Sequence, residues 1–409
     1  MEFIADFHIH SKYSRATSPL MNVEELAIFA RLKGIRLLGT GDFTHPLWIQ
    51  ELRGKLKLDD SGLYRYNDTF FILTTEVCNI FYKNGKPKRI HNIIFSPNFQ
   101  VAERINRELQ NFGNLQADGR PMLNLACKDL VEIVLSIDSN CLIVPAHIWT
   151  PWYSLFGSNT GFDSVYECFE EETKQIFCLE TGLSSDPKMN WRLSTLDRFT
   201  LISNSDAHSP KKIGREANMF NTELSYHSII SALRNKNRQE FLGTIEFFPQ
   251  EGKYHYDGHR SCKVCFSPEE TKRAGNRCPK CGKMITIGVM HRVKKLSDRE
   301  SGFVPDNSIP FRYAIPLEEL IANVKGVGVD SSIVEKEYKA LVTRFGGEFE
   351  ILFNIKEDVL LSKLPTDLAK CIIKVREEKV RIQPGYDGVY GKIEVPITEE
   401  ERPTQLSLF

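Results

Sequence analysis

Two histidines stand two positions apart near the start of the chain, in the segment D-F-H-I-H of residues 6–10. The residues before them are apolar, as in a buried strand, and side chains two apart on a strand point to the same side. His8 and His10 can therefore direct both imidazoles at one point, where they could bind a metal ion. Asp6 shares that side and is a candidate ligand or a partner that orients a histidine.

Further side chains of the metal-binding types recur between residues 42 and 208. Each stands at or just beyond an apolar stretch that reads as a strand. They are His45, His91, His147 and His208, with the carboxylates of Asp42, Glu76, Glu180 and Asp206. Imidazole with carboxylate suits divalent transition metals, and this set exceeds what one ion takes. We therefore expect two or three divalent ions (zinc, manganese or magnesium) close together, an arrangement that serves phosphoester cleavage.

The elements that must position these residues alternate along the chain. Apolar strand-like stretches occur at residues 3–10, 35–42, 70–77, 91–97, 141–148, 177–183 and 200–208. Helical spacing separates them, as in residues 23–34, which end at a glycine. Alternating strands and helices predict a parallel α/β barrel over residues 1–245, with its chemistry at the carboxyl ends of the strands.

In order, these motifs resemble those of the polymerase-and-histidinol-phosphatase (PHP) family. They are D-F-H-I-H-S at 6–11, T-G-D at 40–42, Glu76, His91, P-A-H at 145–147 and N-S-D-A-H at 204–208. The resemblance implies a distorted (β/α)7 barrel with a three-metal site that cleaves phosphoesters. It implies one ion on His8, His10, Glu76 and Asp206, which are also the catalytic candidates. A second ion would lie on Glu76, His91 and His147, and Asp42 and His208 would contribute to a third.

Two departures from the family pattern concern the third ion. The family has another histidine shortly after the first pair, where this chain has the residues K-Y-S-R at 12–15. The family's T-D-H reads T-G-D-F here, so that either Asp42 or His45 must stand in.

Four cysteines form a second constellation of two C-x-x-C pairs, Cys262 with Cys265 and Cys278 with Cys281. This spacing predicts a structural zinc ion held by four thiolates in a ribbon module of residues 246–300. A redox pair is disfavoured, because a second pair is present and the compartment is reducing. Basic residues of the module, Lys294 among them, predict a face that contacts DNA phosphates; an ordinary solvated face is the alternative.

Three aromatic residues follow His147 directly: Trp149, Trp152 and Tyr153. Their loop would lie at the metal end of the barrel, where aromatic rings can stack on a base turned out of the duplex. Packing in the core is the alternative fate of such rings. We expect them, with Lys294, to bind the substrate.

The rest of the chain predicts a helical and β C-terminal region of residues 301–397 that contacts DNA. Its Gly326-Val-Gly328 turn resembles a helix-hairpin-helix, whose backbone N–H groups can meet a phosphate; an ordinary helical turn is an equal alternative. Residues 398–409 read as a flexible tail. Its final QLSLF resembles the peptide by which bacterial repair proteins bind the β sliding clamp, with Gln405, Leu406, Leu408 and Phe409 as anchors.

Composition limits the possible functions. Lys+Arg and Asp+Glu balance at 53 each, so that any contact with DNA must come from local patches. The N-terminus does not resemble a signal peptide, and no apolar run approaches the roughly 20 residues of a membrane span. We expect a cytoplasmic, nucleoid-associated protein without membrane contact.

Together the modules resemble a family of PHP-domain DNA repair endonucleases. This implies metal-dependent hydrolysis on the 5′ side of a deaminated base (uracil, hypoxanthine or xanthine) or an abasic site, in double- or single-stranded DNA. The products would be a 3′-hydroxyl and a 5′-phosphate. The alternatives are a phosphatase for a small monoester, or an inactive accessory factor of a clamp or polymerase. A small substrate would need neither ribbon nor clamp peptide, and a nearly complete ligand set disfavours an inactive barrel.

Overall fold

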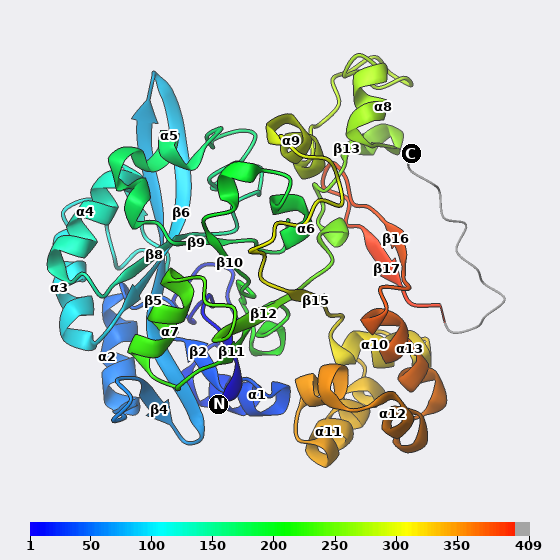
Figure 1. Ribbon diagram of the computed structural model, residues 1–409, viewed down its shortest axis with the longest axis horizontal. Coiled ribbons are helices and arrows are strands. Elements are labelled where there is room, and N and C mark those ends of the chain that lie inside the picture. The colour runs from blue at the N-terminus through cyan, green and yellow to red at the C-terminus, as the bar shows by residue number, and fades with distance from the viewer. Residues whose placement is uncertain (397–409) are drawn as a thin grey trace.

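The computed structural model describes residues 1–396 and is a mixed α/β structure (Figure 1). Its main sheet has eleven strands, in the central order β15-β12-β11-β1-β2-β5-β4-β3, with β6 and β7 paired to β5 and β8 paired to β6. The strands are β1 (Glu2–Asp6), β2 (Leu37–Gly39), β3 (Lys57–Leu58), β4 (Tyr64–Tyr66), β5 (Thr69–Lys83), β6 (Lys86–Ser96), β7 (Met122–Leu123), β8 (Leu142–Pro145), β11 (Ala217–Asn221), β12 (Phe241–Glu246) and β15 (Phe311–Tyr313).

The sheet is mixed, which corrects the expectation of parallel strands throughout. β1, β2 and β5 are parallel neighbours, but β1 is antiparallel to β11, and β6 is antiparallel to β5 and β8. β5 and β6 form one long hairpin, which projects at the top of Figure 1. Asn84 and Gly85 at its turn have φ of 51° and 71°, as a tight two-residue hairpin turn requires.

Strands β9 (Cys178–Glu180) and β10 (Thr200–Ile202) form a separate parallel pair, so the ladders of residues 1–396 do not close into a barrel. Other hydrogen bonds bridge the gaps beside this pair. The Asn218 side chain on β11 accepts from Ser203 N at 3.1 Å and donates to Ser203 O at 2.7 Å, just after β10. After β8, Ile148 N donates to Glu180 O at 3.0 Å. These bonds join β11 to the end of β10 and the end of β8 to β9.

Helices flank the sheet, and the buried faces of the first four share one core with β5 and β6 (Figure 1). Helix α1 (Val23–Lys33) begins where the Asn22 side chain accepts from Glu25 N and ends at Gly34, whose φ is 84°. The others are α2 (Pro46–Lys55), α3 (Phe99–Leu109), α4 (Cys127–Ile137), α5 (Val165–Phe169), α6 (Pro187–Asn190) and α7 (Tyr226–Arg234). None of the helices in residues 1–396 is long and apolar enough to cross a bilayer.

A small module lies at the upper right of Figure 1. It contains the hairpin of β13 (Asp257–His259) and β14 (Val264–Phe266), followed by α8 (Pro268–Arg273) and α9 (Val289–Leu296). Its buried apolar cluster consists of Val264, Cys278 and Ile285. A cluster of this size supplies little folding energy, which is why such modules depend on a metal ion.

The C-terminal helices gather at the lower right of Figure 1. They are α10 (Leu317–Lys325), α11 (Ser332–Phe345), α12 (Glu357–Lys363) and α13 (Thr366–Arg376). α10 ends at Gly326 with φ of 63°, so the glycine turn does join two helices. The last two strands, β16 (Arg381–Gln383) and β17 (Lys392–Glu394), form an antiparallel hairpin. β15 lies in the region predicted as C-terminal, yet it pairs with β12 of the main sheet.

A buried ionic contact joins α1 to the C-terminal helices. Lys33 Nζ donates to Glu348 Oε2 at 2.8 Å, and both side chains are about 4% exposed. Tyr338 Oη donates to the same oxygen at 2.8 Å, and Leu317 N donates to Glu348 Oε1 at 2.9 Å. The buried carboxylate is thus fully hydrogen-bonded, which a buried charge requires.

Candidate metal centre

The chain beyond β1 carries the first two histidines into the interior. His10 N donates to Ala207 O at 3.0 Å, and Ile9 bridges to Ala207, so this segment lies beside the one that carries Asp206. Ile9 is buried in the core, and the histidines on either side of it share the opposite direction. Asp6 is not a ligand. Its oxygens accept from Ser205 N at 3.1 Å and Gly214 N at 2.8 Å, and it holds the neighbouring loop.

The first ligand group consists of His8, His10, Glu76 and Asp206, with one potential ligand atom from each within 4.8 Å of all the others. His10 Nε2 lies 3.0 Å from Asp206 Oδ1 and 3.3 Å from Glu76 Oε2. His8 Nε2 lies 3.5 Å from the same Glu76 oxygen. The buried atoms His8 Nε2, His10 Nε2 and Asp206 Oδ1 have no hydrogen-bond partner in the described part of the chain. Unpaired buried nitrogen and oxygen atoms that converge in this way fit a divalent cation.

A carboxylate stands behind each of these histidines. Glu180 places both oxygens 3.0 Å from His8 Nδ1, and Asp42 Oδ1 lies 3.1 Å from His10 Nδ1. Burial alone would lower the pKa of both histidines, but the two carboxylates outweigh it and raise each pKa well above its usual value. Hydrogen bonding at Nδ1 fixes each ring so that Nε2 faces the ligand group, as in many metal sites.

The second ligand group consists of Glu76, His91 and His147. Glu76 lies on β5 opposite Ile93, and Cys78 lies opposite His91, so Glu76 and His91 are diagonal neighbours on one face of the hairpin. Glu76 Oε1 is 2.8 Å from His91 Nδ1 and 3.1 Å from His147 Nε2. Glu76 therefore faces the first group through Oε2 and the second through Oε1.

The two histidines of the second group differ in pKa, because Glu76 outweighs burial at His147 and raises its pKa, whereas burial prevails at His91. Burial lowers the pKa of His91 to about 4, so this ring is neutral near pH 7. His147 has φ of 31°, an uncommon left-handed conformation of the kind found at functional sites. Gly182 makes room for it, because a Cβ at that glycine would lie 2.5 Å from His147 Cβ.

Three predicted residues lie elsewhere. Asp42 stands behind His10, and no group of three or more potential ligands in residues 1–396 includes it. His208 packs on His10 with ring centres 4.5 Å apart, and its Nδ1 donates to Asp206 O at 2.9 Å. His45 stacks on Tyr13 at 4.5 Å. The structure thus brings together two of the three ligand sets implied by the resemblance.

Arg120 is a residue that the sequence analysis missed. Its Nη1 donates to Glu76 Oε2 at 3.1 Å, and the Glu76 charge raises the pKa of the guanidinium although burial opposes this. It lies between α3 and β7, where neither strand alternation nor a ligand motif marks it. The sequence carries no signal from which this contact could have been predicted.

The aromatic residues after His147 differ in burial. Trp149 is 1% exposed and its Nε1 donates to Asn190 Oδ1 at 2.8 Å, so the prediction that it binds substrate was wrong. Trp152 is 42% exposed and packs edge-on against Tyr254. The Tyr153 ring lies 5.0 Å from that of His91, and Arg89 Nη1 donates to its Oη at 3.3 Å. Two of the three rings therefore lie where a ligand could reach them.

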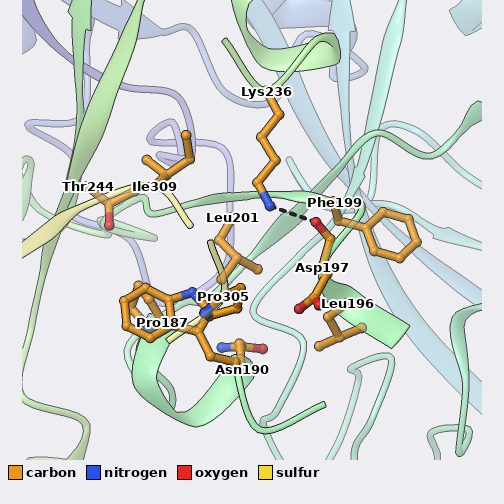
Figure 2. A pocket seen from close by; sticks show the side chains of 11 residues that line it. Pro187, Asn190, Leu196, Asp197, Phe199, Leu201, Lys236, Thr244, Pro305 and Ile309 are labelled. Carbon is orange, nitrogen blue, oxygen red and sulfur yellow. Dashed lines mark hydrogen bonds between the residues drawn. The ribbon is translucent and has the colours of Figure 1, made fainter. Parts of the chain in front are cut away.

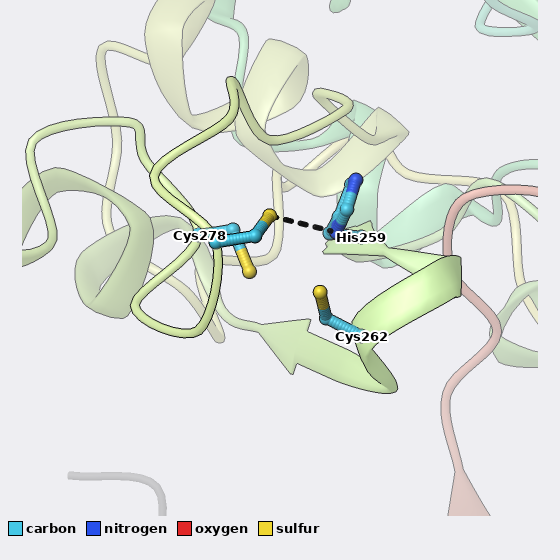
Figure 3. A group of neighbouring side chains, drawn as sticks. His259, Cys262 and Cys278 are labelled. Carbon is cyan, nitrogen blue, oxygen red and sulfur yellow. Dashed lines mark hydrogen bonds between the residues drawn. The ribbon is translucent and has the colours of Figure 1, made fainter.

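The cysteine constellation also needs a correction. The candidate ligand atoms that converge belong to His259, Cys262, Cys278 and Cys281, and Cys265 is not among them (Figure 3). His259 Nδ1 lies 3.7 Å from Cys281 Sγ. Cys265 Sγ instead lies 3.9 Å from Pro384 O.

The register of the β13–β14 hairpin explains why His259, and not Cys265, belongs to the ligand group. His259 lies directly opposite Val264, so their side chains share a face, and Val264 packs beside Cys278. Cys265 is the next residue on the strand and points to the other face. Lys263, with φ of 51°, turns the chain so that Cys262 reaches the first face. Three thiolates and one imidazole remain a common tetrahedral zinc set.

Lys294, a predicted substrate contact, and one further hollow both lie outside the ligand groups. Lys294 is 45% exposed and forms an ion pair with Glu269. A hollow lined by Pro187, Asn190, Leu196 and other residues lies elsewhere, with Lys236 Nζ donating to Asp197 O at 2.7 Å (Figure 2). None of its lining residues belongs to a ligand group, so it is not part of the metal centre.

Comparison with known sequences identifies relatives along most of the chain. A family model described as the MJ0043 C-terminal domain matches residues 316–379. The YqxK protein of Bacillus subtilis is 31% identical over 373 residues, which are 88% of this chain and 89% of YqxK. The MJ0043 protein of Methanocaldococcus jannaschii is 34% identical over 253 residues, or 60% of this chain, and the match spans 31% of its own length.

Solved structures extend the similarity to the fold. The lesion-specific endonuclease PfuEndoQ from Pyrococcus furiosus superposes with a TM-score of 0.88 at 32% identity, covering 99% of this chain and 98% of that one. Endonuclease Q bound to a 27-mer duplex with an abasic lesion at its active site gives a TM-score of 0.86 at 32% identity, with 99% of both chains covered. The aligned span therefore covers the segments that carry the ligand groups, the small module and the C-terminal helices.

Proposed function

The chain belongs to the endonuclease Q family, and on that basis we propose that it is a metal-dependent endonuclease of DNA repair. The proposed reaction hydrolyses the phosphodiester on the 5′ side of a deaminated base (uracil, hypoxanthine or xanthine) or an abasic site. It leaves a 3′-hydroxyl and a 5′-phosphate. The observation that carries the proposal is the pair of buried ligand groups that share Glu76, within a chain that aligns with endonuclease Q over 99% of its length.

The two ligand groups are the proposed sites for two divalent ions (zinc, manganese or magnesium). Such ions supply Lewis acidity to phosphate oxygens and to water. The protein contributes preorganisation: Glu180 and Asp42 hold the rings of His8 and His10 before any substrate arrives. Glu76 reaches both groups with its two oxygens and fixes their separation.

The aromatic residues beside the centre are the proposed receptor for the damaged nucleotide. Tyr153 lies against His91, and the preceding residue of the same loop, Trp152, is exposed. A lesion nucleotide with weakened pairing leaves the duplex at lower cost, and an aromatic face can then stack on it. For an abasic site the same rings would meet the sugar, because no base remains.

Duplex binding is proposed for the small module and the C-terminal helices. In the small module basic residues outnumber acidic ones, and a zinc ion on His259, Cys262, Cys278 and Cys281 would hold its hairpin. Lys294 can exchange its ion pair with Glu269 for a DNA phosphate, because exposed pairs of this kind contribute little stability. The turn at Gly326 is a further candidate for phosphate contact.

The QLSLF peptide is proposed to bind the β sliding clamp. Gln405, Leu406, Leu408 and Phe409 lie outside the described residues, so this proposal rests on their sequence alone. Tethering to a clamp would raise the local concentration of the endonuclease on DNA.

The decisive experiment incubates the purified full-length protein with end-labelled duplexes and Mn²⁺, Mg²⁺ or Zn²⁺. One duplex carries deoxyuridine, one deoxyinosine, one an abasic site, and one is undamaged. We expect a single cut immediately 5′ of the lesion and no cut in the undamaged duplex. Release of phosphate from a small monoester, with all four duplexes intact under every metal, would contradict the proposal and favour a phosphatase.

A further inference from the structure

Protein atoms surround Asp42 at the place where the family resemblance would put a third metal ion. Asp42, which the family resemblance assigns to that ion, has both oxygens occupied. Oδ1 faces His10 Nδ1, while Oδ2 accepts from Ser11 N at 2.6 Å, Ser11 Oγ at 2.6 Å and Ser14 Oγ at 2.8 Å. The side chain is fully buried. Its lone pairs are therefore committed to the protein.

The backbone also closes over Asp42. A Cβ built on Gly119 would lie 2.2 Å from Asp42 Oδ2 and 2.2 Å from Ser14 Oγ, so the glycine backbone occupies the space beside that oxygen. Thr44 Oγ1 donates to Gly119 O at 3.3 Å, and Gly119 N donates to Tyr13 O at 3.1 Å, which fixes the glycine there. A third metal site built on Asp42 does not fit this arrangement.

The next residue brings a positive charge to the same place. Arg120 N is held by Asp118 Oδ1 at 3.2 Å, and its guanidinium reaches Glu76 Oε2 at 3.1 Å. Glu76 Oε2 is the oxygen that faces the two histidines of the first ligand group, so Arg120 approaches that group from the side of Gly119. The Glu76 side chain is fully buried, but that of Arg120 is 28% exposed. The guanidinium thus spans the distance from the shared ligand to solvent.

Most of the donors on Arg120 are available. A guanidinium has five N–H donors, and within residues 1–396 the protein accepts from this one only through Glu76 Oε2. The planar fork matches two oxygens of one phosphate, which a lysine ammonium cannot do. A phosphate held over the two ligand groups would lie beside these donors.

We propose that Arg120 replaces the third metal ion: it supplies the positive charge on that side of the centre and donates to a non-bridging oxygen of the scissile phosphate. This rests on the proposed function. The centre then holds two ions, and Arg120 is a catalytic residue that contacts the substrate. Its fixed charge stabilises the charge that develops on the phosphate during cleavage.

The first measurement is the metal content after equilibrium dialysis against Mn²⁺ or Zn²⁺, read by atomic mass spectrometry. The wild-type chain should retain one ion for each of its three ligand groups, two around Glu76 and one in the small module. Arg120→Met should retain the same number, because Arg120 is not a ligand. A third ion beside the two around Glu76 in the wild-type protein would overturn the proposal.

The second measurement is calorimetric binding of inorganic phosphate to the metal-loaded protein, which does not depend on cutting. Arg120→Met should bind phosphate at least about tenfold more weakly, the effect of losing one charge-assisted contact. Arg15→Met is the matched control, because Arg15 pairs with Asp118 of the same loop and its side chain is 74% exposed. Equal phosphate affinity in the wild-type and Arg120→Met proteins would overturn the proposal.

The third measurement is cleavage of the abasic duplex with a phosphorothioate at the scissile linkage. Arg120→Met should lower kcat by about 10²-fold or more, with Arg120→Lys between it and the wild type. The wild type should discriminate between the two phosphorothioate isomers even with Cd²⁺ present, and Arg120→Met should lose that discrimination. If the wild type cuts the lesion duplex and both properties survive in the variant, the assignment of Arg120 fails while the endonuclease function stands.

Discussion

A substitution at Asp206 should abolish DNA cutting while DNA binding is retained. One of its oxygens faces the Nε2 atoms of both histidines of the first ligand group, without a hydrogen bond of its own in the described chain. Asp206→Asn keeps the shape but removes the negative charge that a cation needs. We expect kcat on the abasic duplex to fall at least about 10²-fold, with DNA affinity unchanged in a gel-shift assay.

The control for this variant is Asp60→Asn, an exposed aspartate outside both ligand groups. It should cut at the wild-type rate. An Asp206→Asn protein that also cuts at that rate would remove the ligand groups from the mechanism.

The ligand residues of the small module provide a second test at the level of single residues. If His259 completes the zinc set, then His259→Ala and Cys281→Ser should lose the ion of the small module, and Cys265→Ser should keep it. Cobalt substitution reads this directly, since the thiolate-to-cobalt absorption reports the number of sulfur ligands. Loss of metal in Cys265→Ser with retention in His259→Ala would restore the four-cysteine site.

At the scale of elements, the contact between α1 and the C-terminal helices rests on one buried carboxylate. Glu348→Gln would leave the Lys33 ammonium buried without its counter-charge, so the free energy of unfolding should fall by about 3 kcal/mol at pH 7. Chemical denaturation followed by tryptophan fluorescence would measure the loss. The surface change Glu335→Gln removes an exposed ion pair with Lys339 and should cost less than about 1 kcal/mol.

The same contact predicts a pH dependence. Burial would raise the pKa of Glu348, but Lys33 and the hydrogen bonds outweigh it, and the folded pKa is lower than its ordinary value of 4.5. A lowered folded pKa stabilises the fold fully above the unfolded value, and this contribution is lost as pH falls through the folded one. The stability difference between the wild type and Glu348→Gln should therefore shrink as the pH is lowered below about 4.5. A difference that stays constant down to pH 3 would contradict this.

Local residue types predicted much of the centre, because ligands at the ends of apolar strands are visible in the sequence itself. Other features depended on contacts across the fold. The Asn84–Gly85 turn marked an antiparallel hairpin, which the alternation of strands and helices concealed. Trp149 follows a strand, but it packs in the main core and its Nε1 donates to Asn190 on another element. Whether Cys265 or His259 joins the candidate ligand group depends on the register of the β13–β14 hairpin, which the spacing of the cysteines does not reveal.

At the scale of the whole molecule, the terminal peptide should act independently of the catalytic centre. A chain ending at residue 404 lacks QLSLF but keeps every residue that the structure describes. It should cut free oligonucleotides at the wild-type rate and lose binding to a purified bacterial β clamp in size-exclusion chromatography. Retention of clamp binding would place the contact elsewhere on the chain.

The pairing of β1 with β11 also sets an order of events during synthesis. Asp6 is 199 positions from Ser205, with which it shares a hydrogen bond, whereas the second ligand group is complete once His147 has left the ribosome. At about 5–20 residues per second, the remaining stretch to Asp206 takes several seconds. Before Asp206 emerges, His8 and His10 already have Asp42 and Glu76 within reach, and the first ligand group lacks only Asp206. The second ligand group can therefore form before the first, and Asp206 is the last of their ligands to be synthesised.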